Sequence, residues 1–243
     1  MTLKRSTINR EIRIGRIVAG HYGVSLPPWA HWDAAQWEHV ADDPAYDEIR
    51  DCMLGWDVTD FGSGDFHRIG RVLLTLRNGR HGDPGYPKPF AEKLLIDPEN
   101  QRAPAHFHQS KREDIIAVAG GNILVQLEKA DPEGKRSGES MPVKVDGVVR
   151  DLEPGGIIRL EPGMSVTIPP RTIHQFWGEE GTGWECEGQR WSLSREVSSV
   201  CDDKADNFFI DVQGVRFPEV EEDEPRLTYL CNEYPRSTPT PVG

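Results

Sequence analysis

The sequence has few cysteines, no excess of positive charge and no long apolar run. Its four cysteines form no CxxC pair, which argues against a zinc knuckle or a dithiol redox site and favours free thiols. Lysine and arginine number 28 against 40 aspartates and glutamates, a net charge of -12, so neither nucleic acid nor an anionic membrane is an expected partner. Since the N-terminus also lacks a signal-peptide core, we expect a soluble cytoplasmic protein.

The length of the chain and its many glycines and prolines indicate one β-rich domain. The 243 residues are enough to bury a substantial core, and 24 glycines and 19 prolines indicate many tight turns. No internal repeat and no long linker divides the chain. We therefore predict a single domain over residues 1–243, with a helical N-terminal extension over 1–55 and a loose tail over 236–243.

Helix signals are concentrated in the first quarter of the chain. Residues 7–20 carry apolar side chains at helical spacing, and a second, short helix starts at Asp33. A third helix has Asp43 as its cap, Pro44 at its first position and Gly55 as its stop. These signals predict that the chain begins with helices before any sheet is formed.

Beyond residue 56 the pattern changes to short apolar segments separated by turn residues. The clearest predicted strands are 71–76, 92–96, 122–128, 143–149, 156–160 and 165–168. Asp146-Gly147 marks a hairpin within this series. Such a series is typical of an antiparallel β barrel, and the fold is predicted to be mainly β with a helical N-terminal elaboration.

Three histidines and a glutamate form the first pattern with chemical content. If His106 and His108 lie on a strand, alternation points both imidazoles to the same face. Glu113 follows a turn and would return beside them on a second strand, and His174 lies far downstream. Neutral imidazoles with one carboxylate suit a divalent first-row metal, and four ligands leave positions for water or substrate. A histidine pair on a strand is by itself more often structural than metal-binding, and Glu113 and Gly120 strengthen the metal prediction.

The spacing of these residues resembles that of the cupin superfamily. The matching stretches are His106-x-His108-x4-Glu113-x6-Gly120 and Gly163-x5-Pro169-x4-His174. The resemblance implies the cupin double-stranded β-helix, a jelly-roll barrel, which agrees with the predicted strands. It also implies that the metal ligands are His106, His108, Glu113 and His174.

A second resemblance, to the D-lyxose isomerase family, extends beyond the cupin motifs. The segments that carry it are 56–62, 75–79, 92–94, 111–116, 120–122, 196–198, 202–203, 206–209, 216–218 and 221–223. They include N-terminal and C-terminal segments that ordinary cupins lack. The resemblance implies a homodimeric aldose–ketose isomerase acting on free sugars, with D-lyxose to D-xylulose as the first reaction and D-mannose to D-fructose as the second.

Such an isomerase moves a hydrogen between C1 and C2, and the lead mechanism passes through an enediol that a divalent metal, best Mn²⁺, would stabilise. The sequence leaves a hydride shift open as the other mechanism. We predict Glu196 as the base, because it follows a strand-like segment and the resemblance places a carboxylate there. Lys111 lies in the turn before Glu113 and is predicted to bind or protonate a substrate oxygen. Glu113 would serve both as ligand and as proton acceptor. A surface glutamate and a solvated lysine are the alternative interpretations.

Further polar and aromatic residues are predicted to bind the sugar, namely Lys93, Asp206, Arg216 and Trp177. Lys93 interrupts an apolar strand, where a charge is uncommon unless it is paired. Trp177 would stack on the sugar, although packing in the core is nearly as common. Asp206 and Arg216 have a helix cap and a surface ion pair as alternative roles.

Three other functions stay open on the sequence alone. The same ligands serve in cupin dioxygenases that use iron. A sugar-binding cupin without catalysis would also keep the barrel. A phosphosugar isomerase would need a phosphate clamp, for which Arg171 and Arg216 are the candidates. Oxygen uptake, binding without turnover, and preference for sugar phosphates respectively distinguish these alternatives.

Overall fold

The computed structural model describes residues 2–202, 205–211 and 214–236. Its helical segments are α1 (Arg5–His21), η1 (Pro28–His31), α2 (Ala34–His39), η2 (Pro44–Tyr46) and α3 (Asp47–Asp51). Its strands are β1 (Leu3–Lys4), β2 (Gly55–Thr59), β3 (Arg71–Arg77), β4 (Phe90–Pro98), β5 (His106–His108), β6 (Glu113–Ala119), β7 (Ile123–Lys129), β8 (Met141–Val145), β9 (Val148–Leu152), β10 (Ile157–Leu160), β11 (Ser165–Ile168), β12 (Thr172–Gly178), β13 (Trp184–Cys186), β14 (Gln189–Ser199), β15 (Asn207–Phe209) and β16 (Val220–Glu221).

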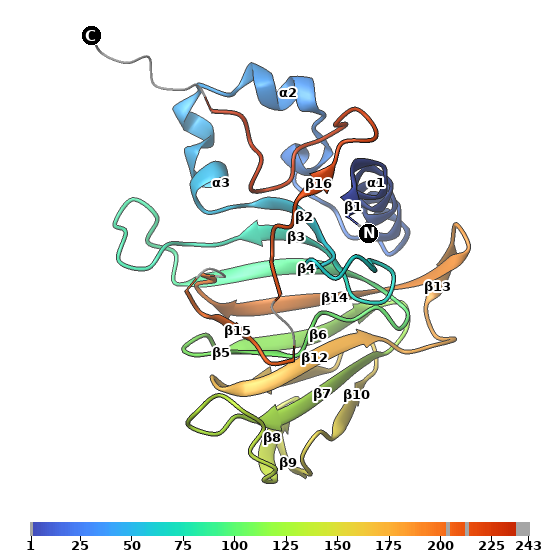
Figure 1. The fold of residues 1–243 in the computed structure, drawn as a ribbon, viewed down its shortest axis with the longest axis vertical. Coiled ribbons are helices and arrows are strands. Elements are labelled where there is room, and N and C mark those ends of the chain that lie inside the picture. Colours follow the sequence, from blue (N-terminus) through green and yellow to red (C-terminus); the bar gives the residue numbers. More distant parts are fainter. Residues whose placement is uncertain (1, 203–204, 212–213, 237–243) are drawn as a thin grey trace.

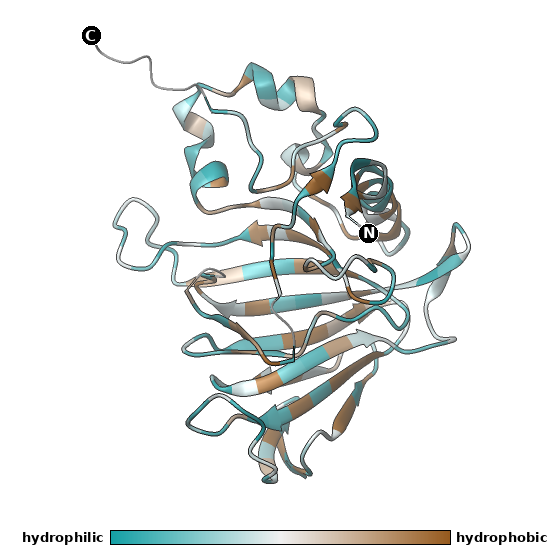
Figure 2. Ribbon diagram, in the orientation of Figure 1, coloured by the Kyte–Doolittle hydropathy of each residue, from teal (hydrophilic) through white to brown (hydrophobic). Residues whose placement is uncertain are grey.

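Two antiparallel sheets form the body of the molecule. The larger has the order β2-β3-β4-β14-β6-β11-β8-β9, with β13 paired to β14, and the smaller has the order β10-β7-β12-β5-β15. Alternating apolar side chains from both sheets meet in one buried cluster, which includes Ile115, Val166, Val125 and Phe176. The banding of apolar and polar residues along the strands is visible in Figure 2. The jelly-roll barrel predicted from the sequence is confirmed.

The helical N-terminal extension covers the outer face of the larger sheet at one end of the molecule (Figure 1). Ile8, Ile12 and Val18 of α1 pack into a second buried cluster with Trp56 and Leu94 from β2 and β4. The part of the larger sheet that contains β2, β3 and β4 is therefore buried on both faces. This explains why residues 71–76 form a nearly continuous apolar run rather than an alternating one.

The sequence placed the end of the third helix wrongly. Asp43 does accept a hydrogen bond from the backbone N–H of Ala45, at 2.9 Å, but it caps only a 3₁₀ turn, and α3 ends at Asp51. Gly55 begins strand β2 instead of stopping a helix, with a φ of 134°. A Cβ at this position would lie 2.0 Å from the Tyr234 hydroxyl oxygen, so glycine is required by the packing of the C-terminal segment.

The C-terminal segment returns to the helical end of the molecule. Strand β16 pairs in parallel with β1, and Glu222 binds the fully buried guanidinium of Arg5 at 2.8 Å. Of the tail predicted over 236–243, residues from 237 onward lie outside the described part of the chain. The hairpin at Asp146-Gly147 is confirmed, since it joins β8 to β9. No helix in the described ranges is long and apolar enough to cross a membrane.

Candidate active site

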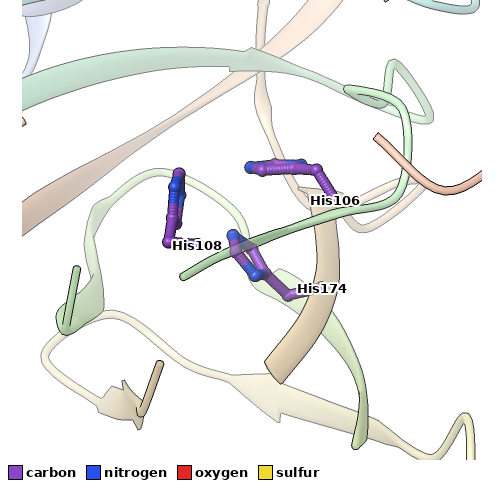
Figure 3. Close-up of side chains that lie close together, drawn as sticks. All are labelled: His106, His108 and His174. Carbon is purple, nitrogen blue, oxygen red and sulfur yellow. The ribbon is translucent and has the colours of Figure 1, made fainter. Parts of the chain in front are cut away.

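The histidines singled out by the sequence meet inside the barrel. His106 and His108 are on β5 and point to one face, and His174 on β12 is the register partner of His106. Ring nitrogens of the three histidines lie within 4.8 Å of one another. Figure 3 shows the three rings gathered around a common space. Strand pairing thus joins residues that are 68 positions apart in the chain (174 − 106).

Backbone carbonyls orient each of these imidazoles. The Nδ1 atom of His106 lies 2.9 Å from the Pro104 carbonyl oxygen, and that of His174 lies 2.9 Å from the Thr172 carbonyl oxygen. His108 makes the same contact with the carbonyl of Asp206, at 3.0 Å. Because a carbonyl can only accept, Nδ1 carries the proton and Nε2 keeps its lone pair.

Burial keeps the imidazoles of His106 and His108 neutral. It lowers the pKa of His106 well below 6.5, and the neighbouring His174 and His108 lower it further. Burial, followed by the nearby Lys111 ammonium, lowers the pKa of His108 to about 4. Neutral imidazoles with a free Nε2 lone pair are the form that binds a metal.

Glu113 on β6 completes a donor set that fits a divalent cation. Its Oε1 lies 2.8 Å from Nε2 of His174, and its Oε2 lies 3.7 Å from Nε2 of His108. No hydrogen-bond donor within the described ranges satisfies Oε1, although this atom is buried. Two lone pairs that face each other at 2.8 Å are unfavourable, and a cation next to them relieves the repulsion. The residues therefore fit a first-row divalent metal with imidazole and carboxylate ligands.

A buried network of charges adjoins these residues. Lys111 Nζ lies 2.5 Å from Glu113 Oε2 and 2.8 Å from Glu196 Oε1. Lys93 Nζ lies 3.2 Å from the same oxygen of Glu196 and 3.0 Å from Cys201 Sγ. Burial alone raises the pKa of Glu196, but Lys111 and Lys93 outweigh it and lower the pKa. Glu196 is therefore held as an ionised carboxylate beside the histidines.

These groups line one cavity inside the barrel. Its walls are formed by Asp57, Thr59, Phe61, Arg71, Leu73, Lys93, Leu95, Ala103, His106, His108, Lys111, Glu113, His174, Phe176, Glu196, Asn207, Phe209 and Arg216. Arg216 donates to Asp57 Oδ2 from Nε at 3.1 Å, so this arginine is paired inside the cavity rather than at the surface. The structure thus brings Lys93, Lys111, Glu113, Glu196 and Arg216 together.

Two predicted sugar-binding residues lie elsewhere. Trp177 is on the other face of β12, where the Arg102 guanidinium stacks on its ring at 3.6 Å, and the neighbouring Phe176 faces the cavity instead. Strand alternation separates these adjacent aromatics. The carboxylate of Asp206 accepts from the backbone N–H groups of Ser110 and Lys111, both at 2.8 Å, so it orders the turn that carries Lys111.

Sequence reasoning missed several residues that line the cavity, including Asp57, Arg71, Phe176 and Asn207. Asp57 stands in a segment that resembles the D-lyxose isomerase family, but nothing local shows where its side chain points. The register of β2 against β3, with Asp57 opposite Leu73, decides that direction. Only a predicted pairing of these strands could have revealed it.

Comparisons with known proteins give relatives that cover nearly the whole chain. The D-lyxose isomerase family model matches residues 3–234. A D-lyxose/D-mannose isomerase from Serratia proteamaculans is 41% identical over 96% of this chain and 99% of its own length. Its counterpart from Escherichia coli O157:H7 is also 41% identical, over 96% of this chain and 98% of its own length.

The fold has solved relatives at much lower identity. The structure of L-ribose isomerase from Acinetobacter sp. DL28 in complex with L-ribose superposes with a TM-score of 0.56 at 15% identity, over 88% of this chain and 94% of that one. This likeness concerns the fold. The family model and the close relatives, which cover nearly the whole chain, show that this protein belongs to the D-lyxose isomerase family and is an aldose–ketose isomerase.

Proposed function

We propose that this chain interconverts D-lyxose and D-xylulose, and also D-mannose and D-fructose. The observation that carries the proposal is the ionised Glu196 carboxylate, bound to Lys111 within the same cavity as three histidines. The names of the relatives at 41% identity support the choice of these two aldoses. Both aldose–ketose pairs share one arrangement around C2 and C3, so one cavity can accept either.

The proposed cofactor is Mn²⁺, held by His106, His108, Glu113 and His174. This ion favours imidazole and oxygen ligands, requires no redox chemistry, and keeps positions for oxygen atoms of a substrate. When bound, it would stabilise negative charge on the carbonyl oxygen and on the neighbouring hydroxyl oxygen. The buried and unsatisfied Oε1 of Glu113 supports this assignment.

Glu196 is proposed as the base that moves a proton between C2 and C1. Proton transfer by a positioned carboxylate requires an ionised group within reach of the carbon, and Glu196 is ionised and lines the cavity. Its low pKa makes it a weak base while Lys111 is bound to it. When Lys111 donates to a substrate oxygen instead, Glu196 loses that partner and its basicity rises. Glu113 then takes or returns the second proton through Lys111.

The proposed sugar-binding residues are Lys93 and Arg216, which line the cavity. Asp206 is proposed to act indirectly, because its carboxylate holds the backbone of the turn at Lys111. For Trp177 we propose a packing role beneath Arg102. Stacking against the sugar falls to Phe176, whose ring is next to His174 on the cavity side of β12.

The first experiment measures ketose formation from a panel of free aldoses. The protein is stripped of metal and assayed with and without added Mn²⁺. Conversion of D-lyxose and D-mannose that depends on Mn²⁺ is the expected result. If protein that demonstrably holds metal forms no ketose from any aldose of the panel, the proposal is refuted. Oxygen uptake by the same sample would then identify a dioxygenase.

A second experiment isolates the base. The Glu196→Gln variant should lose about 10²- to 10⁴-fold in kcat, because glutamine cannot accept the proton, while Mn²⁺ binding persists. Glu185→Gln is the matched control, since the Glu185 side chain is 66% exposed and outside the cavity. Equal kcat values for the two variants would rule out Glu196 as the base.

We also propose a cytoplasmic homodimer organised as one domain. The four cysteines are free thiols, which suits a reducing compartment, and the family resemblance supports the dimer. The barrel and its helical extension share a buried cluster through Trp56, which supports a single folding unit. Sedimentation equilibrium tests the dimer, and coincident unfolding transitions from fluorescence and circular dichroism test the single domain.

A further inference from the structure

Besides Glu113, a second carboxylate in the cavity has an oxygen without a hydrogen-bond donor among the described residues. Asp57, on strand β2, has a side chain that is only 2% exposed. Its Oδ2 accepts a hydrogen bond from Nε of Arg216 at 3.1 Å, and Nη2 of the same guanidinium lies 3.1 Å from this oxygen. Its Oδ1 is buried, and no donor within the described ranges reaches it, although Asp57 lines the cavity.

A second buried aspartate nearby shows what a purely structural pair looks like in this barrel. Asp97 on β4 is also fully buried, and it too is paired with a buried arginine, Arg71, at 2.6 Å. Its other oxygen accepts from the Ser194 hydroxyl at 2.5 Å. Asp97 is thus satisfied on both oxygens and does not line the cavity, whereas Asp57 is satisfied on one oxygen and lines it. The difference indicates that Asp57 has a partner that enters from the cavity.

The missing partner must be a hydrogen-bond donor of a small polar molecule. Buried carboxylate oxygens are strongly destabilised without donors, so an unsatisfied one in a cavity is a recognition group. A sugar presents hydroxyl donors along its whole carbon chain. The reacting carbons must lie beside Glu196 and the histidines, which occupy β14 and the smaller sheet. Asp57 is on β2, an edge strand of the larger sheet. Strands β3 and β4 lie between β2 and β14.

We infer that Asp57 is a specificity-determining residue whose Oδ1 accepts a hydrogen bond from a hydroxyl on C4 or C5 of the sugar. Arg216 positions this carboxylate by holding its other oxygen. Because Arg216 holds Oδ2, Oδ1 is left facing the cavity with its lone pairs, and a hydroxyl at that place binds better than an analogue that lacks it. This inference rests on the proposed function, because it takes the bound molecule to be a free aldose.

The contact is tested by combining a change in the enzyme with a change in the substrate and comparing the effects of each alone and of both together. The kcat/KM of D-lyxose is compared with that of its 4-deoxy and 5-deoxy analogues, for the wild type and for Asp57→Asn, each loaded with Mn²⁺. Asparagine keeps the shape and can still accept from Arg216, but it turns an amide N–H₂ toward the cavity. For the wild type, one deoxysugar should be poorer than D-lyxose by about 10- to 100-fold. For Asp57→Asn, that difference should shrink to less than about 5-fold.

Asp97→Asn is the matched control, because it alters an equally buried aspartate–arginine pair. It should lower thermal stability while keeping the full wild-type discrimination between D-lyxose and the deoxysugar. If Asp57→Asn does not fold, the double variant Asp57→Asn/Arg216→Gln removes both charges of the pair. Its deoxysugar discrimination is then compared with that of Arg216→Gln alone, because Arg216 also lines the cavity.

The outcomes separate the inference from the proposed function. Wild-type protein that converts D-lyxose, with unchanged deoxysugar discrimination in the Asp57 variant, would overturn the role of Asp57 alone. Loss of discrimination in Asp97→Asn to the same degree would overturn it as well, because the effect would then be structural. Wild-type protein that converts no free aldose would refute the proposed function and, with it, the inference.

Discussion

Replacing Lys111 with methionine would remove the one ammonium that two buried carboxylates share. Its Nζ contacts Glu113 at 2.5 Å and Glu196 at 2.8 Å, and the three side chains are 3%, 2% and 8% exposed. Breaking a buried ion pair from one side costs about 3–5 kcal/mol, because a charge is left uncompensated. Glu196 keeps Lys93 at 3.2 Å, so we expect the total loss to fall within that range rather than at twice its value.

The loss of stability should depend on pH in a defined direction. In the wild type, burial raises the pKa of Glu113, but the Lys111 ammonium outweighs it and holds the pKa well below 4.5. Without Lys111 the orphaned carboxylates have raised pKa values and take up protons as the pH falls. The difference in unfolding free energy between wild type and variant is therefore largest near about pH 8 and shrinks toward about pH 5. The change is at most about 1.4 kcal/mol per pH unit for each carboxylate.

Urea unfolding of the metal-free proteins, followed by tryptophan fluorescence at both pH values, measures this difference. Lys129→Met is the control, because the Lys129 side chain is 51% exposed and forms only a surface pair with Glu139. Such a pair contributes about 1 kcal/mol or less. A loss below about 1 kcal/mol for Lys111→Met, or one that does not vary with pH, would contradict the reasoning.

Three further predictions follow from individual residues. Burial and Lys111 lower the pKa of His108 from 6.5 to about 4, so the unfolded chain takes up the proton at a higher pH than the folded protein. Titration of His108 should therefore remove about 3 kcal/mol of stability from the metal-free protein as the pH falls from 6.5 to 4. Urea unfolding across this pH range measures the loss. His174→Ala should weaken Mn²⁺ binding at least about 100-fold by calorimetry, and unchanged affinity would exclude His174 as a ligand. Gly79→Ala should lower stability by more than about 2 kcal/mol, because its Cβ would meet the Lys88 carbonyl oxygen at 1.9 Å. Gly20→Ala, which has open space around it and lies in helix α1, should leave stability unchanged or raise it by about 1 kcal/mol or less, and thermal unfolding of both variants measures the difference.

Local sequence signals located most of the barrel but not all of its strands. The predicted strand 165–168 matches β11, and the hairpin at Asp146-Gly147 joins β8 to β9. Strand β2, by contrast, was not predicted, since Gly55 was taken as a helix stop. Gly55 is an ambiguous signal, because a glycine with positive φ can end a helix or can allow another segment to approach the backbone closely. The hydroxyl of Tyr234, from the far end of the chain, decides between them.

The sequence by itself determined the fold class and the donor set beside which the reaction is proposed. Spacing along a strand is a local property, so the alternation of His106 and His108 sufficed to place both imidazoles on one face. Tertiary structure decided what surrounds them. It turned Trp177 away from the cavity, brought Glu196 to Lys111, and left one oxygen of Asp57 without a donor at the cavity wall. These outcomes depend on which strands pair and in what register, and strand pairing joins residues whose separation along the chain carries no local signal.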